Sequence, residues 1–141
     1  MFLALVILVL IGLSAIIHIG SINNSANTGE QKAVVLTQEN LPAYLESNQI
    51  INDLPEDGAI NIYFGDDVYS IVGNSVDTGT IEDADITIKL PGNYFGKEFR
   101  SICGMIKGAV SKGDLYFETS LSKTKLLWKY RGLVKYRDCM Q

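Results

Sequence analysis

Residues 85–110 read DITIKLPGNYFGKEFRSICGMIKGAV, and the spacing of their apolar side chains changes at Pro91. Before the proline, Ile86, Ile88 and Leu90 alternate with polar residues, which predicts a strand with one face in water. After it, apolar side chains recur every three or four residues, which predicts a helix over about 94–110 with one apolar stripe. The stripe comprises Phe95, Phe99, Ile102, Cys103, Ile106 and Val110. This order of elements predicts an amphipathic helix packed on a sheet.

The flanking segments extend the same arrangement. Two β-rich runs at 60–64 and 68–72 are joined by a short Gly/Asp segment, which predicts a hairpin. A loop at 74–79 and a further strand at 115–119 are also expected. Helices are expected over about 40–51 and from Ser122 or Thr124 onward, because each begins at a residue that can cap a helix. We therefore predict an α+β fold, a mixed or antiparallel sheet of about four to five strands covered on one face by amphipathic helices.

The first twenty residues contain no charged side chain. Twenty helical residues span ~30 Å, the thickness of the hydrocarbon core of a bilayer. No Lys or Arg precedes the apolar run, which is also longer than that of a cleaved signal peptide, so we predict an uncleaved signal-anchor at 1–20. Residues 21–37 are expected to be a flexible tether and residues 38–141 the α+β domain. A single-pass membrane protein with an extracytoplasmic domain is the expected localisation, and the bilayer is its expected partner.

Composition and motifs argue against an enzyme. The 141 residues include one His and two Cys, and the His lies in the apolar leader, where it cannot serve as the base for a nucleophilic Cys. Gly65-Asp66-Asp67 and Asp83-Ala84-Asp85 are better explained as turns than as metal sites. We expect no catalytic residue, no cofactor and no metal. Cys103 is expected to be either a small core residue or one half of a bridge to Cys139.

Charge is divided along the chain. Residues 30–96 carry 2 basic and 12 acidic side chains, whereas residues 97–141 carry 10 basic and 4 acidic ones. Either the two halves attract each other within the fold, or the basic C-terminal helix docks on anionic headgroups. The docking residues would be Lys125, Lys129, Arg131, Lys135 and Arg137. A nucleic-acid partner is not expected, since the whole chain is acidic and shows no nucleic-acid-binding motif.

Residues 57–120 resemble the sterol carrier protein family of lipid-binding domains. The resemblance lies in Asp57-Gly58 with the alternating Ile60, Ile62 and Phe64, then in residues 83–88, and then in residues 113–117 after a helix. It implies a five-stranded sheet with helices over one face, an apolar tunnel for lipid, and no chemistry performed. The wall of that tunnel would be Phe95, Phe99, Ile102, Ile106, Phe117, Leu127 and Tyr130.

Two functions follow from these observations. The first is a membrane-anchored, non-catalytic domain that binds lipid or another apolar ligand in a cavity between helices and sheet. The alternative is a membrane-anchored domain with a solid core, which binds protein or an anionic membrane through the basic C-terminal helix.

Overall fold

The computed structural model describes residues 32–140, which form a mixed five-stranded sheet with helices beside it. Strands β2 (Ala59–Phe64), β3 (Asp67–Val72) and β4 (Ser75–Thr78) run antiparallel in succession. Strand β5 (Ile86–Leu90) lies parallel to β2, and β7 (Tyr116–Thr119) closes the order β4-β3-β2-β5-β7 antiparallel to β5. The predicted α+β class and strand number are confirmed.

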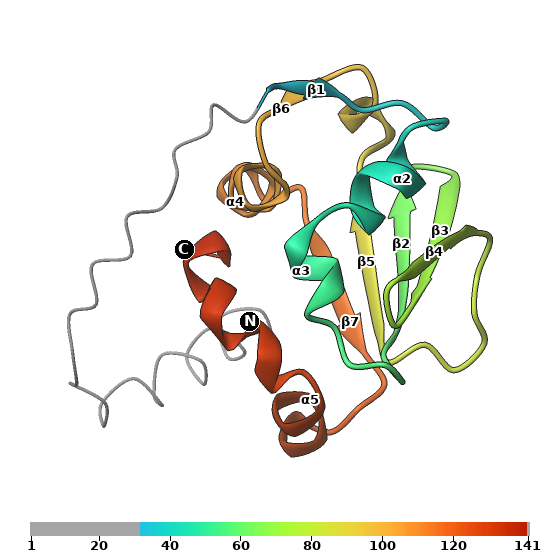
Figure 1. The fold of residues 1–141 in the computed structure, drawn as a ribbon, viewed down its shortest axis with the longest axis vertical. Coiled ribbons are helices and arrows are strands. Elements are labelled where there is room, and N and C mark those ends of the chain that lie inside the picture. The colour runs from blue at the N-terminus through green and yellow to red at the C-terminus, as the bar shows by residue number, and fades with distance from the viewer. Residues whose placement is uncertain (1–31, 141) are drawn as a thin grey trace.

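One face of the sheet carries the core. The register places Ile60, Ile62 and Phe64 of β2 beside Ile71 and Tyr69 of β3, and since side chains alternate along a strand, they share a face. The helical elements gather along one side of the sheet (Figure 1). They are α2 (Leu41–Glu46), α3 (Gln49–Asn52), α4 (Ile102–Lys112), α5 (Lys123–Lys129) and the 3₁₀ helix η3 (Arg131–Met140). One-sided covering of the sheet is thus found as expected.

The helix expected over 94–110 begins later, at Ile102. Gly96 has φ +83°, a left-handed conformation that interrupts any helix, and Ser101 is extended and caps α4 by accepting from the Gly104 N–H. The residues before it form the 3₁₀ turn η2 (Gly92–Tyr94) and strand β6 (Glu98–Phe99). Phe95 and Phe99 therefore lie outside the helix, and the sequence-based boundary was wrong.

Two other segments also differ from expectation. Residues 75–78, predicted as loop, form β4, because Gly73 at φ +58° turns the chain back directly after β3. The helix expected over 40–51 is two short helices, since Asn48 is extended and caps α3 by accepting from the Ile50 N–H. Both differences concern turns of one or two residues, which leave little trace in hydrophobic spacing.

Residues 34–37, predicted as part of the tether, pack with the domain. Val34–Val35 form β1, which pairs antiparallel with β6, and Leu36 is fully buried. Within residues 32–140, no helix has the length and apolar character needed to cross a bilayer. The predicted anchor at 1–20 lies outside the described residues.

A disulfide joins Cys103 of α4 to Cys139 of η3. From the sequence, Cys103 could be either a small core residue or one half of a bridge to Cys139, and the structure shows the bridge. The bridge links η3 covalently to α4. Helix α4 and η3 are also in contact, and the C-terminal end of η3 lies beside α4 (Figure 1).

Candidate functional site

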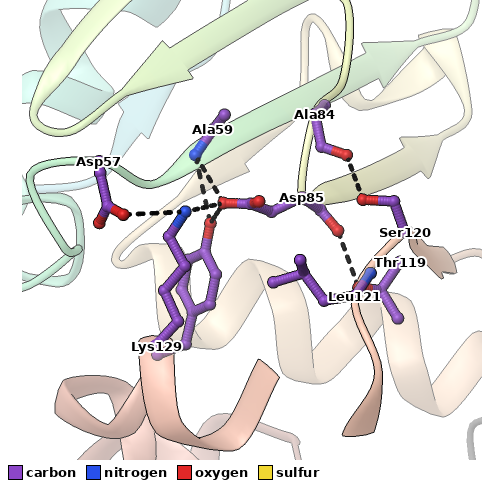
Figure 2. A network of polar contacts seen from close by, with 9 residues as sticks. Asp57, Ala59, Ala84, Asp85, Thr119, Ser120, Leu121 and Lys129 are labelled. Atoms are coloured by element: carbon purple, nitrogen blue, oxygen red, sulfur yellow. Dashed lines mark hydrogen bonds and ion pairs between the residues drawn. The ribbon is translucent and has the colours of Figure 1, made fainter. Parts of the chain in front are cut away.

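A buried carboxylate, Asp85, lies immediately before β5 and is only 7% exposed. Its Oδ2 accepts a hydrogen bond from the Tyr130 hydroxyl at 2.8 Å and one from the Ala59 N–H at 3.2 Å. The same oxygen lies 2.8 Å from Nζ of Lys129, which also contacts Asp57 at 3.3 Å (Figure 2). Donors from β2 and from the end of α5 therefore meet at one oxygen.

The backbone of Asp85 holds the segment between β7 and α5, just before α5 begins. Its carbonyl oxygen accepts from the Thr119 hydroxyl at 2.8 Å and from the Ser120 N–H at 3.1 Å, and the Ser120 hydroxyl donates to the Ala84 carbonyl (Figure 2). Helix α5 is thus fixed to the sheet both before its first turn and after its last.

The protonation of this network follows from its contacts. Burial raises the pKa of Asp85, but hydrogen bonds from Lys129 and Tyr130 outweigh it and lower the pKa overall. The hydrogen bond to Asp85 raises the pKa of Lys129, and burial together with the same carboxylate raises the pKa of Tyr130 well above its ordinary value. At neutral pH the network is a carboxylate, an ammonium and a neutral phenol.

This network is arranged to hold α5 and not to transfer protons. A general base needs a pKa near the working pH and a lone pair that substrate can reach. Here Asp85 is more acidic than usual, Tyr130 is harder to deprotonate, and the Asp85 Oδ2 is already surrounded by three donors. We interpret the cluster as the support of the surface formed by α5.

That surface contains an open pocket of about 420 Å³. Its lining is partly apolar and partly charged, and comprises Pro55, Asp57, Leu121, Lys125, Trp128, Lys129 and Arg131. We call this set the α5 pocket. Trp128 is 72% exposed, and its ring centroid lies 4.7 Å from the guanidinium carbon of Arg131. The pocket thus places an exposed aromatic ring beside cationic side chains.

Two of the pocket's cations are available to a ligand. Lys129 is neutralised by Asp57 and Asp85. Among the ion pairs of residues 32–140, none involves Lys125 or Arg131. The same part of the chain contains no group of three or more metal-ligating side chains. The pocket therefore presents two cations beside an apolar surface, an arrangement that suits an anionic group attached to an apolar chain.

The seven residues predicted as a lipid-binding wall lie apart from this pocket. Ile102 and Tyr130 are buried in the core, and four others pack against it, namely Phe95, Phe99, Ile106 and Phe117. The seventh, Leu127, is half-buried on α5. Phe95, for example, packs on Phe64 with ring centroids 5.0 Å apart. The structure brings six of the seven into or against one core, and none of the seven lines the α5 pocket.

The five residues predicted to dock on a membrane differ in their ion pairing. Lys129 belongs to the Asp85 network, Lys135 pairs with Asp53 at 2.7 Å, and Arg137 lies 3.8 Å from Asp138. Only Lys125 and Arg131 line the α5 pocket without a carboxylate partner. Sequence reasoning missed Trp128, although its position two residues from both Leu126 and Tyr130 turns it away from the buried side of the helix.

Comparison with known proteins gives a weak structural likeness. No family model matches this chain, and no curated protein matches it. Among solved structures, a chain described as "UbiJ-SCP2 Ubiquinone synthesis protein" is similar, with 11% identity and a TM-score of 0.38, over 72% of this chain and 85% of that one. At this identity and TM-score the likeness carries no inference about family or function.

Proposed function

We propose that this chain is a non-catalytic lipid-binding domain that holds an anionic amphiphile at the α5 pocket. The observation that carries the proposal is the juxtaposition of exposed Trp128 with Lys125 and Arg131 around one pocket. The pocket has a volume of about 420 Å³ and is open to solvent, so it would hold a ligand at the surface.

An amphiphile matches both parts of this lining. Leaving a Trp in water forgoes much of the free energy that its large apolar surface would gain on burial, so an acyl chain over Trp128, Leu121 and Pro55 recovers it. A carboxylate or phosphate between Lys125 and Arg131 gains charge-assisted hydrogen bonds. Asp57 shares the single positive charge of Lys129 with Asp85, so Lys125 and Arg131 must outweigh its remaining negative charge. A neutral apolar ligand would gain only the first of these two contributions.

The proposal extends to the location of the domain. Residues 1–20 would anchor the chain in a bilayer as a single-pass protein, with the domain on the extracytoplasmic side. The Cys103–Cys139 bridge supports that side, since disulfides persist in oxidising compartments. An enclosed cavity behind the seven predicted wall residues would require the core to open, so we place the lipid at the α5 pocket instead.

The single Trp of the chain provides a direct measurement, because it lies in the pocket. We would titrate the full chain with oleate below its critical micelle concentration and follow the emission of Trp128, using oleyl alcohol as the uncharged counterpart. Oleate should shift the emission to shorter wavelength and bind roughly tenfold more tightly than the alcohol, since two charge-assisted contacts are lost with the carboxylate.

A pair of charge-reversal variants makes the test specific. Lys125→Glu with Arg131→Glu should abolish the preference for oleate. Lys107→Glu with Lys112→Glu, two exposed lysines of α4, makes the same change in net charge and should preserve the preference. Equal binding of oleate and oleyl alcohol by the unaltered chain, or an equal loss in both variants, would refute an anion site at α5.

A further inference from the structure

The segment η3 is a 3₁₀ helix of ten residues, Arg131–Met140. Runs of 3₁₀ helix beyond about 3–4 residues are uncommon, because the hydrogen-bond geometry is poorer than in an α-helix. A segment of this kind gains little from its own backbone. Its position must therefore depend on the contacts that it makes with neighbouring elements.

Those contacts are a disulfide, the binding of Asp53, and the packing of Leu133 against the core. Cys139 is buried and bonded to Cys103 of α4. In the middle of the segment, Lys135 and Tyr136 both bind the carboxylate of Asp53, which follows α3. The Lys135 side chain is largely exposed, and ion pairs of that kind contribute little. The disulfide is thus the strongest attachment of η3.

The segment also forms part of the α5 pocket. Its first residue, Arg131, lines the pocket, and Asp53, to which its middle is bound, lies two residues before Pro55, which also lines it. Gly132 lies so close to Asp53 that an added Cβ would come within 3.1 Å of the Asp53 carbonyl oxygen. If η3 detaches, Asp53 loses its contacts with Lys135 and Tyr136, while the Asp85 network still holds the end of α5.

We propose that the Cys103–Cys139 disulfide is a redox-sensitive latch that regulates the α5 pocket, an inference that rests on the function proposed above. The co-reactant is a protein dithiol acting in the same extracytoplasmic compartment, since that compartment otherwise preserves disulfides. Its thiolate attacks Sγ of Cys103, which is half-exposed, and breaks the S–S bond to leave a mixed disulfide. The second thiol of the reductant then displaces Cys103, so the reductant leaves as a disulfide while Cys103 and Cys139 each end as a protonated thiol. Residues 131–140 are then released.

Hydrogen exchange of the full chain measures the latch without any lipid. In the presence of a dithiol, amides of residues 131–140 should exchange roughly tenfold faster or more, while those of β2, β3 and β5 keep their protection. The double variant Cys103→Ser with Cys139→Ser should behave like the reduced chain and should not respond to the dithiol. Oleate affinity, measured on the same samples, should fall several-fold on reduction.

The outcomes separate the latch from the proposed function. Faster exchange in 131–140 with no oleate binding in either redox state would support the latch and refute the lipid site. Unchanged exchange in 131–140 after complete reduction would refute the latch, whatever the lipid result. Loss of protection throughout the sheet would also refute it, because the bridge would then be a part of global stability and not a local switch.

Discussion

At the scale of single residues, Asp85 determines how α5 is held. Its Oδ2 accepts hydrogen bonds from the Tyr130 hydroxyl and the Ala59 N–H and forms an ion pair with Lys129, and the residue is almost fully buried. Such a group stabilises the fold only while its partners are present, since an unpartnered buried charge is costly. The Asp-x-Asp pattern that resembles a metal motif in the sequence is therefore part of an internal ion pair.

This placement predicts the effect of Asp85→Asn. The variant keeps the side-chain volume but removes the negative charge opposite Lys129, so it should lower the free energy of unfolding by about 3 kcal/mol, the lower end of the range for breaking a buried pair. Asp57→Asn is the matched control, because Asp57 contacts the same Lys129 but its side chain is 80% exposed. It should cost less than about 1 kcal/mol. Equal losses, measured by urea unfolding, would contradict the role of burial.

The same carboxylate predicts a dependence of stability on pH. The pKa of Asp85 is lowered from the ordinary 3.8, so the unfolded chain takes up this proton at a higher pH than the folded chain does. Its contribution is complete above about pH 5 and is lost as the pH falls through the folded pKa. The difference in unfolding free energy between the unaltered chain and Asp85→Asn should therefore shrink from pH 5 towards pH 2. A difference that stays constant over that interval would contradict the assigned charge.

At the scale of elements, two glycines of α4 should respond in opposite ways to alanine. Gly108 lies inside the helix, and an added Cβ would meet nothing within 4 Å, so Gly108→Ala should stabilise the domain by up to ~1 kcal/mol. Gly113 caps the helix at φ +72°, a conformation that alanine adopts with strain, so Gly113→Ala should destabilise it by about 1 kcal/mol. Thermal unfolding of the two variants checks both signs, and a shift in the same direction would count against this cap.

Elements with regular hydrophobic spacing could be predicted from the sequence, whereas their ends could not. The alternation at 60–64 and 86–90 identified β2 and β5, because the apolar side chains of these strands share one face of the sheet. The stripe at 94–110 extended the helix too far, since Phe95 and Phe99 satisfy helical spacing by coincidence while Gly96 adopts a left-handed conformation. Backbone conformation at a single glycine outweighs a spacing that spans several residues.

The location of the candidate site could not be predicted from apolar spacing. Apolar spacing predicted a stripe of which Ile102 is buried and Phe95, Phe99 and Ile106 pack against the core, but it left out Met105 and Ala109, which are buried on α4. It does not show whether such residues fill space or enclose it. The α5 pocket instead uses residues that spacing leaves out, Trp128, Lys125 and Arg131, brought together with Pro55 by contacts distant in the sequence.

At the scale of the whole molecule, basic side chains of the C-terminal part form ion pairs with acidic side chains of the N-terminal part. Lys129 and Lys135 of the basic part pair with Asp57, Asp85 and Asp53 of the acidic part. Attraction between the halves, one of two explanations for the charge pattern, is therefore found in the fold. It engages two of the five predicted docking cations, Lys129 and Lys135, whereas Lys125 and Arg131 take part in none of the ion pairs of residues 32–140.

The last prediction separates the proposed anchor from that local site. Full chain reconstituted with neutral phosphatidylcholine vesicles should remain with them at high salt, because an apolar span of twenty residues does not depend on charge. A chain lacking residues 1–20 keeps every residue of the described fold and should bind only vesicles that contain anionic lipid. It should be released as salt rises, since two exposed cations are screened beyond about 10 Å at 0.1 M. Release of the full chain by salt alone, measured by vesicle flotation, would contradict the anchor. Salt-resistant binding of the shortened chain would contradict an electrostatic site at α5.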